Sequence, residues 1–342
     1  SEFGGRQLNS FTELNYKISK RGSITNLGLN LITDNFTEKV IDPNLIRDQE
    51  YLTSGGYINN LWDINNKLSI ESGLRTDYVQ ASSQVSKSSG ETFILPRFSA
   101  LYKMNTNLSL RFGGGMGYRM PTIFSEEAEP LGYKNIQAID FENVTAECSY
   151  GTNLDLKYQS TFGSDNILLT LNQMFFFNLI ENPVFLIYYS DGFYANGDGK
   201  VHSRGFESQI KLSVWKFTWF FGYTFTDAFN RKTNLFLTPR HSIKGDLLFV
   251  EDDKWRIGWD YEYKSEQLLS TGLESPSLFT TGVVIERTLD NFVIFLNAEN
   301  FTDARQSKYE SMISGPYDTP QYTDVWAPMD GFFFNAGLKI KL

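Results

Sequence analysis

Residues that could perform chemistry are few and dispersed in this 342-residue chain. His202 and His241 are its two histidines and Cys148 is its single cysteine, so neither a histidine-rich metal site nor an internal disulfide is expected. We expect both histidines to be polar residues of strands or loops. The sequence also has no nucleophile elbow and no Gly-Lys-Ser phosphate loop. These observations argue against an enzyme and against a resident cofactor.

One short segment gathers carboxylates. Glu126, Glu127 and Glu129 lie within four residues of one another and could offer Ca²⁺ the hard oxygen ligands that it prefers. No Asp-x-Asp-x-Asp spacing accompanies them, so a solvated acidic loop is the simpler interpretation.

Aromatic residues in two long irregular segments are better candidates for ligand binding. They are Tyr188, Tyr189, Phe193 and Tyr194 in the first segment, and Tyr317, Tyr322 and Trp326 in the second. Aromatic rings supply rigid contact area to a planar or amphipathic ligand. The same rings could instead fold the loops onto themselves. Arg119, at the base of another long segment, could attract an anionic ligand, although pairing with a nearby carboxylate is the alternative.

A period of two governs the segments that must position these residues. Trp255, Ile257, Trp259, Tyr261 and Tyr263 alternate with Arg256, Gly258, Asp260, Glu262 and Lys264. In a strand, alternate side chains point to opposite faces, so this pattern predicts one apolar and one polar face. Residues 206–214, 217–226 and 332–340 repeat it.

The connections between these strands alternate in length. Short turns are expected at residues 19–22, 64–67, 104–107, 162–165, 214–216, 251–254 and 287–291. Long segments are expected at residues 34–50, 80–91, 119–143, 179–203, 227–240, 265–277 and 302–330. Outer-membrane barrels combine tight periplasmic turns with long external loops, whereas a soluble sandwich has no reason for this alternation.

Composition agrees with a barrel. The net charge of −9 and the scattered basic residues argue against nucleic-acid binding, and no apolar run is long enough for a membrane-spanning helix. Aromatic residues make up 15% of the chain, enough to build the interfacial girdles of a barrel. We therefore predict an all-β chain in which residues 1–342 form one transmembrane antiparallel β-barrel domain.

About 15 strands are expected, whereas bacterial barrels have even numbers. The simplest explanation is that an N-terminal part of the barrel lies outside this chain, and a strand missed by the pattern is the alternative. The charged side chains of the polar face, among them Arg75 and Asp77, should form a mixed-sign wall that pairs across neighbouring strands or with a plug packed inside the barrel.

Seven local motifs then resemble, in order, the C-terminal part of the barrel of TonB-dependent outer-membrane receptors. They are Gly-Leu-Arg-Thr-Asp at 73–77, Leu-Pro-Arg-Phe-Ser at 95–99, Gly-Tyr-Arg-Met-Pro-Thr at 117–122, Phe-Phe-Asn-Leu-Ile-Glu-Asn at 176–182, Ser-Arg-Gly-Phe-Glu at 203–207, Thr-Pro-Arg-His at 238–241 and Asn-Ala-Glu-Asn-Phe-Thr-Asp at 297–303. The chain departs from many relatives by Leu179 in place of Arg and by ending in Leu342 rather than Phe.

The resemblance implies a barrel of about 22 strands with an N-terminal plug, of which this chain would hold neither the plug nor the first strands. It also implies residence in the outer membrane of a Gram-negative bacterium, contact with lipid and lipopolysaccharide, and energy coupling to TonB through the plug. The expected activity is import of a scarce large ligand such as an iron-siderophore, haem or cobalamin.

Three other functions stay open at this point. A passive porin of about 16 strands would need neither plug nor energy coupling. A glycan importer would share the barrel and pair with a surface lipoprotein. A structural or adhesive surface barrel is a further possibility.

Overall fold

The computed structural model describes residues 3–39, 46–87, 89–125, 127–129, 131–163, 167–188, 191–230, 233–235, 237–269, 271–317 and 321–340. Its long strands are β1 (Gly5–Lys20), β2 (Ser23–Glu38), β3 (Gln49–Asp63), β4 (Leu68–Ser83), β5 (Ser89–Lys103), β6 (Leu108–Arg119), β7 (Glu147–Phe162), β8 (Ile167–Glu181), β11 (Val201–Val214), β12 (Phe217–Asn230), β14 (His241–Glu251), β15 (Trp255–Lys264), β16 (Leu278–Leu289), β17 (Phe292–Glu299) and β20 (Phe333–Ile340). Within the described residues, the helical content is a single 3₁₀ turn, η1 (Gln306–Lys308).

These fifteen strands of the described chain follow one another in a single sheet, in chain order from β1 to β20. The order confirms the predicted all-β fold and the expected number of about 15 strands. A short sixteenth strand, β13 (Thr233–Asn234), pairs with the end of β12 and lies off this path. His202 and His241 both lie in strands, as expected.

Connection lengths alternate as predicted. Turns of two to four residues follow β1, β3, β5, β7, β11, β14 and β16, whereas segments of five to 33 residues follow β2, β4, β6, β8, β12, β15 and β17. The segment between β4 and β5 is shorter than expected, because strand pairing continues as far as Ala81 opposite Ser89. We call the two ends of the strands the short-turn end and the loop end.

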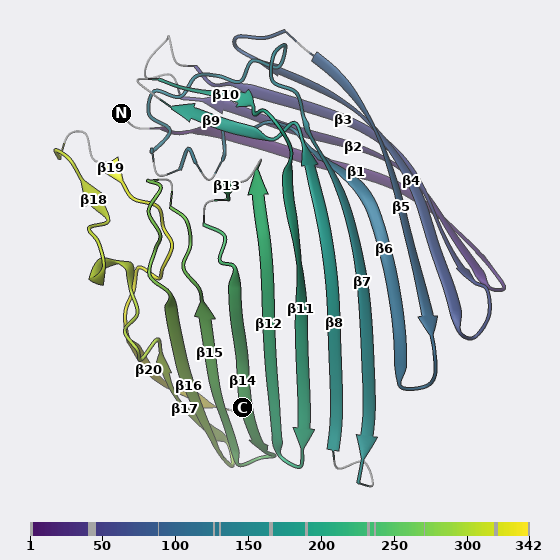
Figure 1. Cartoon of the computed structure of the whole chain (residues 1–342), viewed down its shortest axis with the longest axis vertical. Coiled ribbons are helices and arrows are strands. Elements are labelled where there is room, and N and C mark those ends of the chain that lie inside the picture. The colour runs from purple at the N-terminus through teal and green to yellow at the C-terminus, as the bar shows by residue number, and fades with distance from the viewer. Residues whose placement is uncertain are drawn as a thin grey trace. The chain divides into compact units, whose positions relative to one another are not determined.

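The chain divides into two compact units. Unit 1 comprises Ser1–Lys103, Arg111–Asn153 and Phe177–His202, and unit 2 comprises Met104–Leu110, Leu154–Phe176 and Ser203–Leu342. Figure 1 shows the strands of each unit lying side by side. Among the described residues, the structure has no helix long and apolar enough to cross a membrane.

The sheet of unit 1 exposes apolar side chains and buries polar ones. Leu29 of β2 is 64% exposed, whereas the next residue, Asn30, is 7% exposed. Leu27 and Leu31 share the exposed face with Leu29 because strand side chains alternate. This distribution is the reverse of that in a water-soluble protein, and it fits a sheet whose apolar face meets lipid.

In unit 2 the strand register extends the apolar face across six strands. One row runs from Trp219 through Leu247, Trp259, Val283 and Ala298 to Phe334. The next row, on the other face, pairs Asp246 with Asp260 and then Gly282. We call these the apolar face and the polar face of the sheet. The predicted division of residues 255–264 between two faces is therefore confirmed, and it extends over these six strands.

Loop-end segments have small cores of their own. In unit 1, β9 (Val184–Tyr188) and β10 (Gly192–Asn196) form a hairpin at the loop end of the strands (Figure 1). It packs with the segment after β6 in a cluster of buried apolar residues, which includes Phe36, Ile123, Ile136 and Tyr194. In unit 2, η1, β18 (Ile313–Ser314) and β19 (Gln321–Tyr322) belong to the last long segment, which has a separate core.

Candidate ligand pocket

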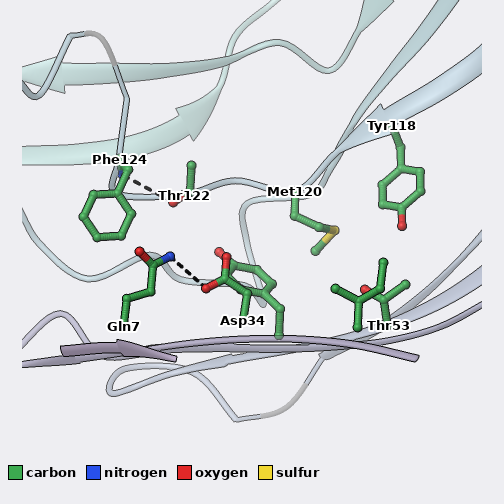
Figure 2. A pocket seen from close by; sticks show the side chains of 9 residues that line it. Gln7, Asp34, Thr53, Tyr118, Met120, Thr122 and Phe124 are labelled. Carbon is green, nitrogen blue, oxygen red and sulfur yellow. Dashed lines mark hydrogen bonds between the residues drawn. The ribbon is translucent and has the colours of Figure 1, made fainter. Parts of the chain in front are cut away.

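Unit 1 contains a pocket of about 490 Å³ at the loop end of its strands. Its lining comes from β1, β2, β3 and β6 and from the segment that follows β6. The lining residues are Gln7, Ile32, Asp34, Tyr51, Thr53, Tyr118, Met120, Thr122 and Phe124. Figure 2 shows the Gln7 and Asp34 side chains directed toward one another, with Met120 and Tyr118 further along the pocket.

Strand register explains why these residues converge. Asp34 lies opposite Tyr51, and Ile32 lies opposite Thr53, in the ladder between β2 and β3. Each pair is separated from the next by two residues along its strand, so all four side chains share the polar face. The same face carries Asn30, whose burial contrasts with the exposed Leu29. The pocket therefore opens on the side of the sheet opposite the apolar face.

One wall of the pocket is a loop segment fixed by β3. The Gln49 side chain is 2% exposed and donates from Nε2 to Thr122 Oγ1 over 3.1 Å. Its Oε1 accepts the backbone N–H of Ile123 over 3.3 Å. The Tyr51 hydroxyl donates to the carbonyl of Pro121. These bonds attach residues 121–123 to the start of β3 and so set the positions of Thr122 and Phe124.

Beneath the pocket lies a buried charge. Asp77 of β4 is 2% exposed and accepts from Arg75 Nε over 2.9 and 2.8 Å. The Tyr118 hydroxyl donates to the same carboxylate over 3.0 Å. The Tyr118 ring stacks on Phe93, with ring centroids 3.9 Å apart. A lining residue of the pocket is thus fixed by an ion pair within one strand, whereas the predicted pairing across neighbouring strands occurs between Arg97 of β5 and Glu71 of β4.

A glycine makes room for this network. A Cβ at Gly55 would lie 2.3 Å from Asp77 Oδ1 and 2.4 Å from Asn30 Oδ1. Distances this short require displacement of both side chains. Gly55 therefore permits the close approach of two polar groups, one from each neighbouring strand.

The hairpin of β9 and β10 contacts the loop segment that lines the pocket. Tyr194 is 6% exposed and donates from its hydroxyl to the carbonyl of Ile123 over 2.9 Å. Burial raises the pKa of the Tyr194 hydroxyl to about 12. Burial, and then the Glu129 carboxylate, also raise the pKa of Tyr133 in the neighbouring segment. Both phenols are therefore neutral at physiological pH.

A second contact ties together two loop segments. Arg47 and Glu38 form a buried ion pair across the base of residues 39–48, in which Arg47 Nε donates to Glu38 Oε2 over 2.9 Å. Arg47 also donates to the carbonyl of Tyr133 and lies 4.7 Å from the ring centroid of Phe3. Each of these contacts keeps the loop end of unit 1 closely packed around the pocket.

The lining suits the binding of a small molecule. Asp34 is the one formally charged residue among the nine, and it accepts from Gln7 Nε2 over 2.9 Å. The other lining groups are phenols, threonine hydroxyls, an amide, a thioether and apolar groups. Such a mixture provides contact area and a few oriented hydrogen bonds, which is typical of small-molecule sites.

Comparison with family models gives a match over residues 2–301 to the family described as "TonB dependent receptor-like, beta-barrel". The chain belongs to this family. A comparison with curated proteins found no match. The fold and the sequence resemblance therefore agree on a TonB-dependent receptor barrel.

Solved structures extend the likeness of fold. The FrpB iron transporter from Neisseria meningitidis (F3-3 variant) has a TM-score of 0.73 at 14% identity, with 98% of this chain and 55% of that chain covered. The copper transporter OprC has a TM-score of 0.77 at 11% identity, with 98% and 56% covered. The siderophore receptor PirA from Acinetobacter baumannii has a TM-score of 0.70 at 15% identity, with 98% and 54% covered. This chain thus spans about half the length of these receptors.

Of the loop candidates from sequence, those in unit 1 have different environments. Tyr194 is buried in the loop core, whereas Phe193 is 41% exposed. Tyr188 ends β9 opposite Gly192, although its side chain lies outside the described part of the chain, as does all of Tyr189. Arg119 donates to Glu147 over 2.7 Å, in line with the alternative that it pairs with a carboxylate. Of the candidates whose side chains the structure describes, Phe193, Tyr194 and Arg119 are not among the residues that line the pocket.

The candidates in the last long segment of this receptor barrel belong to unit 2. Trp326 is 6% exposed and donates from Nε1 to Glu310 Oε1 over 2.7 Å, so it packs the segment onto itself. Tyr317 is fully exposed. Tyr322 lies in β19 opposite Ile313, and its side chain lies outside the described part.

For the proposed calcium site, Glu127 and Glu129 are exposed and Glu126 lies outside the described residues. Among the residues that the structure describes, no group of three His, Cys, Asp or Glu side chains could hold a metal ion.

Sequence reasoning did not single out the pocket residues Asp34, Tyr51, Tyr118 and Met120 as ligand candidates. They are not clustered in sequence, and register alone brings them together. One signal was present: alternate residues of 49–57 near a long connection include Gln49, Tyr51 and Thr53, which marks a polar face at the loop end.

Proposed function

We propose that this chain is the C-terminal part of the barrel wall of an outer-membrane receptor that imports a scarce large ligand with energy from TonB. The observation that carries the proposal is the pocket in unit 1, which opens on the polar face at the loop end of a barrel of the TonB-dependent receptor family. In outer-membrane barrels the long loops face outward, so a ligand arriving from outside would meet this end first.

The candidate ligands are an iron-siderophore, haem or cobalamin. Solved structures of similar fold include an iron transporter, a copper transporter and a siderophore receptor, which supports a metal chelate as the ligand class. The formal charge of the pocket lining is −1, from Asp34. A neutral or cationic chelate, such as a ferric hydroxamate, fits this lining better than a strongly anionic catecholate does.

The remainder of the receptor belongs to the proposal. The first strands of the barrel and the plug would be supplied by protein outside this chain, and the plug would contact TonB. The similar solved chains are nearly twice as long as this one, which supports such an arrangement. Membership of the receptor family favours this function over a passive porin of about 16 strands. A surface lipoprotein partner would be expected if the ligand were a glycan.

Binding to the full-length receptor tests the proposal. The purified receptor is titrated with a ferric hydroxamate, a ferric catecholate, haem and cobalamin. Asp34→Lys removes the carboxylate acceptor of the lining and changes its charge from −1 to +1. A neutral ligand then loses an acceptor and a cationic ligand is also repelled, so the affinity should fall about tenfold. Asp252→Lys, in the exposed turn after β14, is the matched control and should leave the affinity unchanged.

Uptake provides the second measurement. A strain that lacks the receptor should grow poorly when the bound chelate is its sole source of iron or corrinoid, and the wild-type gene should restore growth. If the strain that lacks the receptor took up all four ligands as fast as the wild type, the proposed substrate class would be refuted. Equal affinities of the Asp34→Lys receptor and the wild type for the imported ligand would refute the assignment of the pocket.

A further inference from the structure

Two arginines in unit 2 share one carboxylate at the loop end of the sheet. Arg204 of β11 donates from Nε and Nη2 to Asp227 Oδ2 over 3.0 and 2.9 Å. Arg240, immediately before β14, places Nη2 at 3.5 Å from Asp227 Oδ1. We call these three residues the arginine triad. Its formal charge is +1.

The triad lies on the apolar face. Phe225 and Tyr223 lie at alternate positions of β12, on the face that carries Trp219, and Asp227 is two residues beyond Phe225. Arg204 precedes Phe206 by two residues, and the Phe206 ring lies 5.7 Å from the ring of Phe225. Arg204 therefore reaches Asp227 from the side of the sheet that meets lipid. The Arg240 guanidinium reaches Asp227 beside the Phe225 ring of the same face.

The position along the strands is that of a membrane interface. Ten residues separate Phe217, at the short-turn end of β12, from Asp227. At a rise of about 3.3 Å per residue and a strand tilt of about 40°, this corresponds to about 25 Å along the membrane normal. The apolar band of an outer-membrane barrel has about that height. When Phe217 lies at one edge of the band, the triad lies at the other.

The charge and exposure of the triad suit an anionic partner. The side chains of Arg204 and Arg240 are 60% and 58% exposed, whereas that of Asp227 is 17% exposed. The guanidinium carbons lie 5.5 Å from the ring centroid of Phe229 and 5.9 Å from that of Phe225, respectively. Asp227 thus holds the two guanidiniums side by side without neutralising both, and their remaining N–H groups can bind phosphate oxygens in pairs.

Aromatic side chains lie next to the triad, on the side toward the middle of the apolar band. His241 Nδ1 lies 2.8 Å from the Tyr223 hydroxyl, and the His241 ring lies 5.4 Å from that of Phe225. Rings with a polar tip are favoured at the boundary between hydrocarbon and headgroups. A lipid whose phosphate met the triad would lay its acyl chains along these rings.

We propose that the arginine triad binds the phosphate of a lipopolysaccharide molecule in the outer leaflet. The inference rests on the proposed outer-membrane location, since the loop end of the strands then faces the cell exterior, where the outer leaflet presents phosphorylated glycolipid. A phospholipid phosphate shares the same chemistry, and the experiment separates the two sources.

Binding is measured on the full-length receptor, purified from outer membranes in detergent and stripped of lipid. The probes are bisphosphorylated lipid A, dephosphorylated lipid A and phosphatidylglycerol in mixed micelles. The wild type should bind bisphosphorylated lipid A about tenfold more tightly than either other probe. Arg204→Gln combined with Arg240→Gln should lower that affinity about tenfold.

Two further variants separate lipid binding from a structural role. Asp227→Asn raises the triad charge from +1 to +2, so it should strengthen lipid A binding, whereas loss of a structural ion pair would weaken it. Arg287→Gln is the matched control, because Arg287 lies on the apolar face at the short-turn end, 4.6 Å from the Trp255 ring centroid. Its affinity for lipid A should equal that of the wild type. Heat-modifiable migration in electrophoresis confirms that each variant is folded.

The outcomes distinguish this inference from the proposed function. Three results would each overturn the lipopolysaccharide site. The wild type could bind phosphatidylglycerol as tightly as bisphosphorylated lipid A, Asp227→Asn could bind lipid A more weakly than the wild type, or the double arginine variant could bind lipid A as tightly as the wild type. A receptor absent from the outer-membrane fraction would refute the proposed location instead. The double arginine variant should bind the imported chelate like the wild type, since the triad lies on the apolar face and the pocket on the polar face.

Discussion

The Tyr118 hydroxyl donates a 3.0 Å hydrogen bond to Oδ2 of Asp77, and this bond joins the wall of the pocket to a buried carboxylate. Asp77 is in turn bound by Arg75 of the same strand. A ligand in the pocket would therefore contact a phenol whose orientation is fixed by an ion pair rather than by the ligand. Such preorganisation lowers the entropic cost of binding.

Removing the charge of Asp77 should destabilise the barrel. Asp77→Asn should lower the free energy of unfolding by about 2 kcal/mol, less than is typical of a fully buried pair because the Arg75 side chain is 34% exposed. Tyr118→Phe should cost about 1.5 kcal/mol, since it loses one hydrogen bond to a charged acceptor. Urea unfolding of the full-length receptor in detergent, followed by tryptophan fluorescence, measures both. Tyr102→Phe, at an exposed position of β5, is the control and should have the unfolding free energy of the wild type. Equal urea midpoints for all variants would contradict a stabilising role of the Arg75, Asp77 and Tyr118 contacts.

Gly55 and Gly56 make a matched pair of substitutions. Gly55→Ala places a methyl group against two buried oxygens and should cost about 2 kcal/mol of unfolding free energy. The Cβ of Gly56→Ala would meet the terminal Cδ2 of Leu29 at 3.3 Å, so that variant should change stability by less than about 0.5 kcal/mol. Chelate titration should also show weaker binding for Gly55→Ala only. Equal unfolding free energies and equal chelate affinities for Gly55→Ala and Gly56→Ala would contradict this account of Gly55.

Tyr194 should make the loop core sensitive to alkali. Its pKa in the folded protein is raised to about 12, so its contribution to stability is complete below the ordinary tyrosine pKa of about 10 and is lost as pH rises through 12. Titration of phenolate absorbance should show a late-ionising tyrosine that disappears in Tyr194→Phe. That variant should also lose about 1 kcal/mol at neutral pH, because it cannot donate to Ile123. An unchanged absorbance titration would show that Tyr194 is not buried.

Asp303 should make the last long segment sensitive to acid. The hydrogen bond from Lys308 Nζ, at 2.7 Å, and then the N–H of Phe332 lower the pKa of Asp303 below its ordinary value. The contribution of Asp303 to stability is therefore present above about pH 4, and it is lost as pH falls through the pKa of Asp303 in the folded protein. Limited proteolysis should cut this segment faster in Asp303→Asn at neutral pH than in the wild type. Asp330→Asn is the control, and equal cleavage of the two variants would disprove the role of Asp303.

The strands and their connections could be predicted because their signal is local. Alternation at residues 255–264 assigns each side chain to a face from its own sequence, and the expected segment at 265–277 matches the interval between β15 and β16. The length over which two strands stay paired was harder to predict. The shorter segment between β4 and β5 reflects hydrogen bonding between strands, which the composition of residues 80–91 does not show.

The pocket could not be predicted, for a related reason. Asp34 and Tyr51 meet through the register of two strands, and Met120 joins them through a loop held by Gln49. Loop aromatics posed the opposite difficulty, since the same residue type can bind a ligand or pack a loop. Tyr194 and Trp326 are buried in loop cores, and no feature of their local sequence distinguishes them from an exposed ring such as Tyr317.

Spin labels on adjacent residues of β15 test most directly the claim that one face of the sheet meets lipid and the other faces the barrel interior. The full-length receptor, with Cys148→Ser, carries single labels through Trp259→Cys, Asp260→Cys, Tyr261→Cys or Glu262→Cys and is placed in lipid vesicles. Labels at 259 and 261 should collide mainly with dissolved oxygen, and labels at 260 and 262 relatively more with a water-soluble nickel chelate. Four labels with the same ratio of the two collision rates, or all four shielded from both reagents, would contradict the account.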